Sequence, residues 1–151
     1  MSFFDAISVA ASGLTAERVR MDVTSENLAN ADTTQGANGQ PYQEQEVQLQ
    51  TVGSNSFSDM LSGAMGGGTS SNSVPAGGVE VTGIVNSSTP DQDVYDPGSP
   101  GANAQGYVKM PNVNPVNEMV DMIDESRSYE SDVTAMNTAK EMFEKTLDLL
   151  K

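Results

Sequence analysis

Two short stretches contain residue types that could bind an ion or a phosphate. The segment DQDVYD, residues 91–96, carries three carboxylates in six residues, and calcium loops are similarly acidic. An EF-hand needs an oxygen ligand at its fifth position and glycine at its sixth, where Tyr95 and Asp96 stand, so calcium binding is not favoured. The segment GGGTSS, residues 66–71, lacks the lysine of a P-loop and follows no buried strand, so a flexible linker is favoured over a phosphate site.

Catalytic chemistry has few candidate groups in this chain. It contains no cysteine and no histidine, which removes thiol nucleophiles, imidazole bases and the usual ligands of transition metals. The neighbouring acids Asp124 and Glu125 could in principle act as an acid and a base, but adjacent residues of a helix point apart. We therefore expect a protein that is not an enzyme, with no catalytic residue, no cofactor and no metal site.

The charge of the chain limits the partners it could bind. Twenty-one acidic residues against seven basic ones give a net charge of −14, which repels nucleic-acid phosphates and anionic lipids. The N-terminal MSFFDAISVAASGL has an acid where a signal peptide needs positive charge, and no apolar run reaches the roughly 18 residues of a membrane span. We expect protein partners, no nucleic acid, no direct membrane insertion and no cleaved signal peptide.

The first 31 residues carry a helical pattern. Ser2 and Asp5 are spaced as a capping box, and the helix is expected to run from about residue 2 to residue 30. Gly13 should weaken this helix by up to about 1 kcal/mol relative to alanine. Apolar residues every seven positions form a narrow seam for a partner helix. They are Ile7, Leu14, Met21 and Leu28, with Phe4 and Ala11 in the early part of the stripe.

Residues 32–111 form a polar middle region rich in Gly, Ser, Asn, Gln and Pro, and residues 53–77 are its most linker-like part. Alternating apolar residues predict two short strands, one around Val47 and Leu49 and one from Val79 to Val85. An isolated pair of strands is only marginally stable in water, so this small β-ribbon must pack against the helices or against another molecule. The following YDPGSPG, residues 95–101, predicts consecutive turns.

Residues 112–151 predict a second long helix. Asn114 is expected to cap it and Pro115 to occupy its first position. Two series with a spacing of seven residues follow, and eight of their ten members are apolar. One series is Met122, Tyr129, Met136, Phe143 and Leu150, and the other is Met119, Ser126, Val133, Lys140 and Leu147.

These three regions predict a mainly α protein. The long N- and C-terminal helices should pack together as one domain in a coiled coil, with a small, partly flexible β and loop insertion between them. The seams could also be the core of a monomeric helical hairpin, and periodicity alone leaves that alternative open. We expect the apolar stripe of the C-terminal helix to need further apolar surface from other subunits.

Three blocks of the sequence resemble the flagellar basal-body rod protein family, and within it the proximal rod proteins. They are SGLTAERVRMDVTSENLANADT at residues 12–33, YDPGSPGANAQGYVKMPNVNPVNEMVDMI at residues 95–123, and SRSYESDV with the amphipathic tail at residues 126–151. The residues that carry the resemblance are Asn27, Ala29, Asn30, Tyr95, Asp96, Pro97, Gly106, Tyr107, Pro111, Asn112 and Asn114. Ser99 and Gly101 depart from the family's turn motif, where histidine and aspartate are expected, and residues 41–47 lack expected basic residues.

The resemblance implies a structural subunit of the flagellar rod. Such a subunit is exported by the flagellar type III apparatus without a cleaved signal, assembles in the periplasm with copies of itself and other rod proteins, and transmits torque through its terminal helices. Aspartate at Met122, Met136, Phe143 or Leu147 would then abolish assembly. The alternative is an acidic helical adaptor or chaperone of an export apparatus, which would clasp one client with the same helices.

Some polar residues have two interpretations. Asn27 and Asn30 could cap the C-terminus of the first helix, or they could orient the loop that touches a neighbouring subunit. Arg18, Arg20 and Arg127 could form ion pairs between helices or subunits, although solvated side chains are the ordinary expectation.

Overall fold

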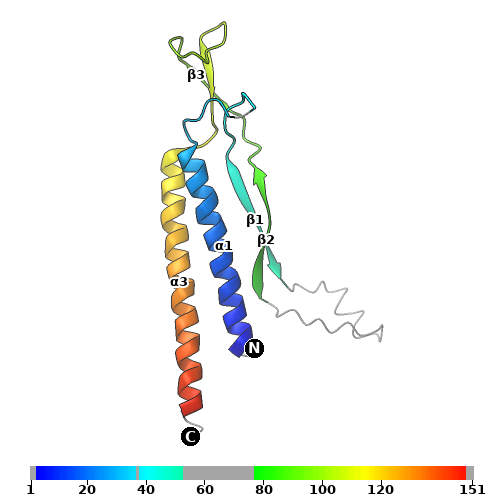
Figure 1. The fold of residues 1–151 in the computed structure, drawn as a ribbon, viewed down its shortest axis with the longest axis vertical. Coiled ribbons are helices and arrows are strands. Elements are labelled where there is room, and N and C mark those ends of the chain that lie inside the picture. The colour runs from blue at the N-terminus through cyan, green and yellow to red at the C-terminus, as the bar shows by residue number, and fades with distance from the viewer. Residues whose placement is uncertain (1–2, 37, 53–76, 149–151) are drawn as a thin grey trace, which may run out of the picture. The chain divides into compact units, whose positions relative to one another are not determined.

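The computed structural model describes residues 3–36, 38–52 and 77–148 (Figure 1). Ser2, Leu150 and residues 53–76 lie outside this range. The order of the elements confirms two long helices with a small strand region between them. The elements are α1 (Phe3–Ala29), β1 (Gln45–Val52), β2 (Gly78–Asn86), β3 (Gln92–Tyr95), β4 (Tyr107–Met110) and α3 (Pro115–Asp148).

The chain divides into two compact units. The first unit combines Met1–Ala16, Leu49–Thr82 and Tyr129–Lys151, and the second combines Glu17–Gln48 and Gly83–Ser128. Each unit therefore contains half of α1 and half of α3, together with one end of the β1–β2 ribbon.

In the first unit, α1 approaches both the ribbon and α3 closely. The hydroxyl of Ser12 donates to the carbonyl of Val9 at 2.7 Å and accepts from the backbone N–H of Val79, the second residue of β2, at 3.1 Å. A Cβ atom added at Gly13 would lie 2.7 Å from Oδ2 of Asp132 on α3. The glycine that lowers the helical propensity of α1 thus makes room for a side chain of the other helix.

Strands β1 and β2 form a two-stranded sheet, as the alternating apolar residues predict. In the first unit the carbonyl of Val52 accepts from the N–H of Gly77 at 3.3 Å, and in the second the carbonyl of Glu44 accepts from the N–H of Ser87 at 2.7 Å. The end of β1 is thus bonded next to the start of β2, and the residue before β1 is bonded to the residue after β2, so the ribbon is antiparallel.

A second antiparallel pair, β3 with β4, was not expected from the sequence. Its register runs from Gln92 opposite Met110 to Tyr95 opposite Tyr107. The predicted turns lie between the strands, where Oδ1 of Asp96 accepts from the N–H of Gly98 at 3.1 Å. Gly106 has a φ of +83°, and a Cβ there would lie 2.9 Å from the ring of Tyr95, so a side chain at this position would be strained.

Helix α3 begins where the sequence predicts. Oδ1 of Asn114 accepts from the N–H of Val116 at 3.0 Å, and the carbonyl of Asn114 accepts from the N–H of Glu118 at 3.0 Å. Pro115 occupies the first helical position, where its missing N–H has no helical partner to lose.

The buried interior among the described residues is small and unusually polar. The buried hydrophobic residues are Ala16, Val23, Val108 and Val113, and the buried polar ones are Thr24, Asn27, Asn112, Glu118 and Glu125. Hydrogen bonds between side chains must therefore contribute much of the specificity of the second unit.

Candidate assembly interface

The inward face of α3 contains one of the two predicted series. Met122, Tyr129 and Met136 are partly buried, while Phe143 is 36% exposed. The residues that directly precede members of the companion series are more buried. Glu118 and Glu125 are 5% and 4% exposed, and Asp132 is partly buried. In the predicted companion series, Val133 is partly buried, and Met119, Ser126, Lys140 and Leu147 are exposed.

The predicted seam of α1 is partly buried throughout, at Ile7, Leu14, Met21 and Leu28. The most buried positions of this helix lie elsewhere, at Ala16 in the first unit and at Val23, Thr24 and Asn27 in the second. Small and polar side chains thus occupy the most enclosed sites of α1.

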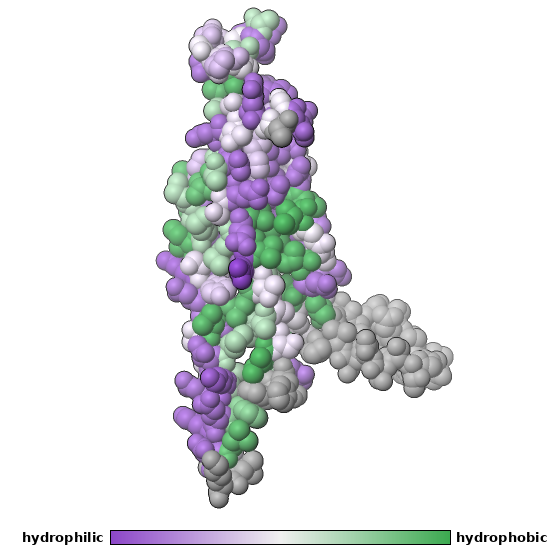
Figure 2. All heavy atoms as spheres, in the orientation of Figure 1, coloured by the Kyte–Doolittle hydropathy of each residue, from purple (hydrophilic) through white to green (hydrophobic). Residues whose placement is uncertain are grey.

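The first turns of α3 present an apolar ridge to solvent. It consists of Val116, Met119, Val120 and Ile123, whose exposed fractions run from 48% to 65%. Their spacing of three and four residues puts them on one side of the helix, away from Glu118 and Glu125. Figure 2 shows hydrophobic residues reaching the surface in several patches on the face in view. An exposed apolar stripe of this kind is typical of surfaces that bind other proteins.

The C-terminal turns of α3, in the first unit, also leave apolar side chains accessible. Met142 is 65% exposed and Leu147 is 48% exposed. Leu147, a member of the companion series, lies four residues after Phe143 of the inward series, so this side of the helix is incompletely covered among the described residues.

Asn27 joins three segments of the second unit. Its Nδ2 donates to the carbonyl of Gln45 at 2.9 Å and to Oε2 of Glu118 at 3.1 Å. Its Oδ1 accepts from the N–H of Gln45 at 2.9 Å and from the hydroxyl of Tyr42 at 2.9 Å. The residue is 3% exposed, so it acts as a buried connector and not as a simple cap.

Asn30 ends α1 in a different way. Its backbone N–H and its Nδ2 both donate to the carbonyl of Glu26, at 3.1 and 2.9 Å. Its Oδ1 accepts from the hydroxyl of Thr33 at 3.3 Å. Asn30 therefore satisfies the last turn of the helix without a positive φ, which no described residue other than glycine adopts.

Two carboxylates of α3 lie against α1 in a poorly hydrated setting. Oε1 of Glu125 accepts from the hydroxyl of Thr24 at 3.1 Å and lies 3.5 Å from Nε of Arg20. Burial raises the pKa of Glu125, an effect that Thr24 and Arg20 partly oppose, and burial likewise raises the pKa of Glu118, partly opposed by Asn27. Arg20 also pairs with Glu17 at 3.2 Å, whereas Arg127 and Asp124 form an exposed pair at 4.0 Å.

Asn112 ties together the segments that precede α3. Its Oδ1 accepts from the N–H of Glu44 at 2.9 Å, and its Nδ2 donates to the carbonyl of Thr89 at 3.2 Å. The neighbouring residues Pro111 and Val113 are buried. Asn112 thus fixes the residue before β1 and the chain between β2 and β3, and Asn27 fixes the first residue of β1, Gln45.

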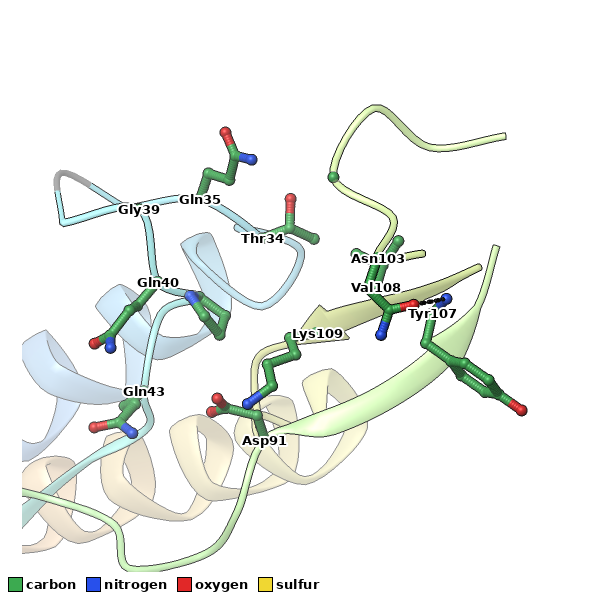
Figure 3. Close-up of a pocket in the computed structure, with 12 residues that line it drawn as sticks. Thr34, Gln35, Gly39, Gln40, Gln43, Asp91, Asn103, Tyr107, Val108 and Lys109 are labelled. Atoms are coloured by element: carbon green, nitrogen blue, oxygen red, sulfur yellow. Dashed lines mark hydrogen bonds between the residues drawn. The ribbon is translucent and has the colours of Figure 1, made fainter. Parts of the chain in front are cut away.

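An open hollow of about 350 Å³ lies between the loop after α1 and the β3–β4 hairpin (Figure 3). Asp91 and Lys109 point toward one another there, and Oδ1 of Asn103 accepts from the N–H of Tyr107 at 2.9 Å. Glutamine, threonine and glycine residues form much of the remaining wall. The described residues contain no group of acids that could hold a metal ion, and no described helix is long and apolar enough to cross a membrane.

Comparison with known proteins identifies the family. A family model described as flagella basal body rod protein matches residues 7–37, and one described as flagellar basal body rod FlgEFG protein C-terminal matches residues 104–149. The flagellar basal-body rod protein FlgC of Bacillus subtilis is 47% identical over the full length of both chains. The chain belongs to the FlgC family. The FlgC protein of Escherichia coli is 42% identical, covering 99% of this chain and 98% of its own, and that of Borreliella burgdorferi is 37% identical, covering 100% and 99%.

Parts of the two segments that match the rod-family models meet in the second unit. Asn27 comes from the first matched segment, and Glu118 and Glu125 come from the second. The sequence motif pointed to Asn27, Gly106, Asn112 and Asn114, and each has a structural contact or conformation that explains its residue type. It did not point to the two buried glutamates, although an acid repeated after seven residues in an otherwise apolar seam was a signal that could have found them.

Tyr42 is expected to make the second unit sensitive to alkali. Burial, with Glu26, Glu118 and Glu44 nearby, raises the pKa of its hydroxyl from 10.0 to about 12. Between these pH values the folded state keeps a proton that the unfolded state releases, so stability falls as the pH rises. Tyr42→Phe should flatten this part of a plot of the urea midpoint against pH. Equal slopes in the parent and in Tyr42→Phe would contradict the assignment.

Proposed function

We propose that this protein is a structural subunit of the flagellar basal-body rod and that it assembles with copies of itself and with other rod proteins through α1 and α3. The observation that carries the proposal is the apolar ridge of Val116, Met119, Val120 and Ile123, exposed on a helix whose inward face is already occupied. Membership of the FlgC family supports the rod as the place of assembly. The role is mechanical, not catalytic.

Pairing of the helices as a coiled coil is part of the same proposal. It is supported in the second unit by the contacts of Thr24 and Arg20 with Glu125, and in the first unit by the approach of Asp132 to Gly13. Other subunits would then cover the apolar groups that remain accessible, including Leu147 near the end of α3. Such interlocked helical faces would transmit torque along the rod.

Delivery and location follow from the same proposal. The family supports export by the flagellar type III apparatus, without a cleaved signal, and residence in the periplasmic part of the basal body. We expect no nucleic-acid partner and no direct membrane insertion, since the net charge of −14 disfavours phosphates and anionic lipids.

Electron cryotomography of cells that lack the gene tests this function. We expect the flagellar base to persist while the rod is absent, and a plasmid copy to restore the rod. Mass spectrometry of purified rods should then detect the chain in amounts comparable with other rod proteins. An intact rod in the deletion strain would refute the proposal. A missing rod together with absence of the chain from purified rods would instead indicate an export adaptor.

A further inference from the structure

A second hollow, of about 260 Å³, lies where α1, the start of β1 and α3 meet within the second unit. Its walls contain five carboxylates, and we call it the acidic hollow. The carboxylates belong to Glu44, Glu46, Glu118, Asp121 and Glu125, and Arg20 is the one basic residue among the described residues that line it.

Glu125, which lines this hollow, has an unused acceptor. Its side chain is buried, with the residue 4% exposed, and its Oε1 takes the contacts from Thr24 and Arg20. No donor among the described residues reaches its other oxygen, Oε2, which is also buried. A buried carboxylate oxygen without a partner is costly, so a donor from outside the described chain would stabilise it.

Arg20 is a poor candidate for neutralising the hollow alone. Its guanidinium is shared with Glu17 at 3.2 Å, and its side chain is 40% exposed. One arginine also faces five carboxylates, and desolvation already disfavours the ionised forms of Glu118 and Glu125. The site therefore attracts a further positive charge.

We propose that the acidic hollow receives an arginine side chain from a neighbouring subunit in the rod. The guanidinium group carries several N–H donors in a planar fork, which suits Oε2 of Glu125 together with the carboxylate of Asp121, one helical turn away. A metal ion is a poorer fit, because the described acids include no group that could hold one. The inference rests on the proposed function, since the donor must come from an adjacent subunit of the assembly.

The direct test is a cryo-EM reconstruction of purified basal bodies. We expect the side chain of an arginine from an adjacent subunit within hydrogen-bonding distance of Oε2 of Glu125. A hollow that contains only water, or only residues of its own chain, would overturn the inference while leaving the rod function intact. Absence of the chain from the rod would instead refute the proposed function.

Variants give an independent test that separates assembly from folding. Glu125→Gln keeps the shape of the side chain and an acceptor for Thr24, and should reduce the number of rods per cell about tenfold or more, because it removes the charge that the arginine needs. Asp121→Asn should give a smaller reduction. Asp124→Asn removes the same charge from α3 outside the hollow and should have no effect.

The stability of the purified full-length chain decides how these results are interpreted. Glu125→Gln replaces a desolvated carboxylate by a neutral amide, so its urea midpoint should be equal to or higher than that of the parent. A fall in stability parallel to the fall in rod number would show that Glu125 serves only the fold of its own subunit, and would overturn the inference.

Discussion

Asn27→Ala is expected to lower the free energy of unfolding of the subunit by about 3 to 5 kcal/mol, because the change leaves several buried polar groups without a partner. These groups are the hydroxyl of Tyr42, the N–H and carbonyl of Gln45, and the carboxylate of Glu118. Urea unfolding of the full-length chain, followed by far-UV circular dichroism, measures the change.

Two further variants make the test specific to the connector. Asn27→Asp keeps the oxygen that accepts from Tyr42 and Gln45 but loses the donor to Glu118 and adds a like charge beside it, so it should destabilise as much as alanine. Asn30→Ala removes a cap at the end of the same helix and should cost about 1 kcal/mol or less. Similar losses for Asn27→Ala and Asn30→Ala would contradict the role assigned to Asn27.

Ile123→Asp should have the opposite profile, with little change in the subunit and loss of the assembly. Ile123 is 53% exposed, so the substitution should alter the free energy of unfolding by no more than about 0.5 kcal/mol. In the rod, however, a charge would be buried against an apolar partner without compensation, and rods should be undetectable. Swimming in soft agar and cryotomography of the same strain measure the outcome.

The matched control places the same charge on another side of the helix. Ser128→Asp is also exposed, and it lies off the line through Val116, Val120 and Ile123. It should leave motility unchanged. Normal rods in Ile123→Asp cells, or equal defects in the two strains, would show that the ridge is not part of the interface.

Local signals predicted the ends of the helices and the first ribbon well. Asn114 and Pro115 fix the start of α3 through a cap and a permitted proline, both of which depend on residues next to each other. The alternation around Val47 and Val79 likewise predicted β1 and β2. Strands β3 and β4 were missed because four-residue strands are too short for a clear alternation, and β3 contains the polar Gln92 and Asp93.

The side chains between the helices were harder to predict. A spacing of seven residues assigns the inner positions of α3 to apolar groups such as Met119, yet Glu118 and Glu125 are the buried ones. Their partners, Asn27 and Thr24, lie 91 and 101 residues away in the sequence, so no local pattern reveals that the polar groups satisfy one another. The polar residues Ser126 and Lys140 in the predicted series were the sequence signal that this series is not the most buried one.

The long sequence separation between Asn27 and Glu118 also determines when the second unit can fold. In a chain exported end-first, as proposed above, α1 and the start of α3 emerge at different times, and the polar groups of the segment that emerges first stay in water without their partners. The second unit therefore closes only after both have emerged. A truncated product without α3 would leave Thr24 without its acceptor and Asn27 without its contact to Glu118, so incomplete chains should be recognised by proteases before they can compete for a place in the assembly.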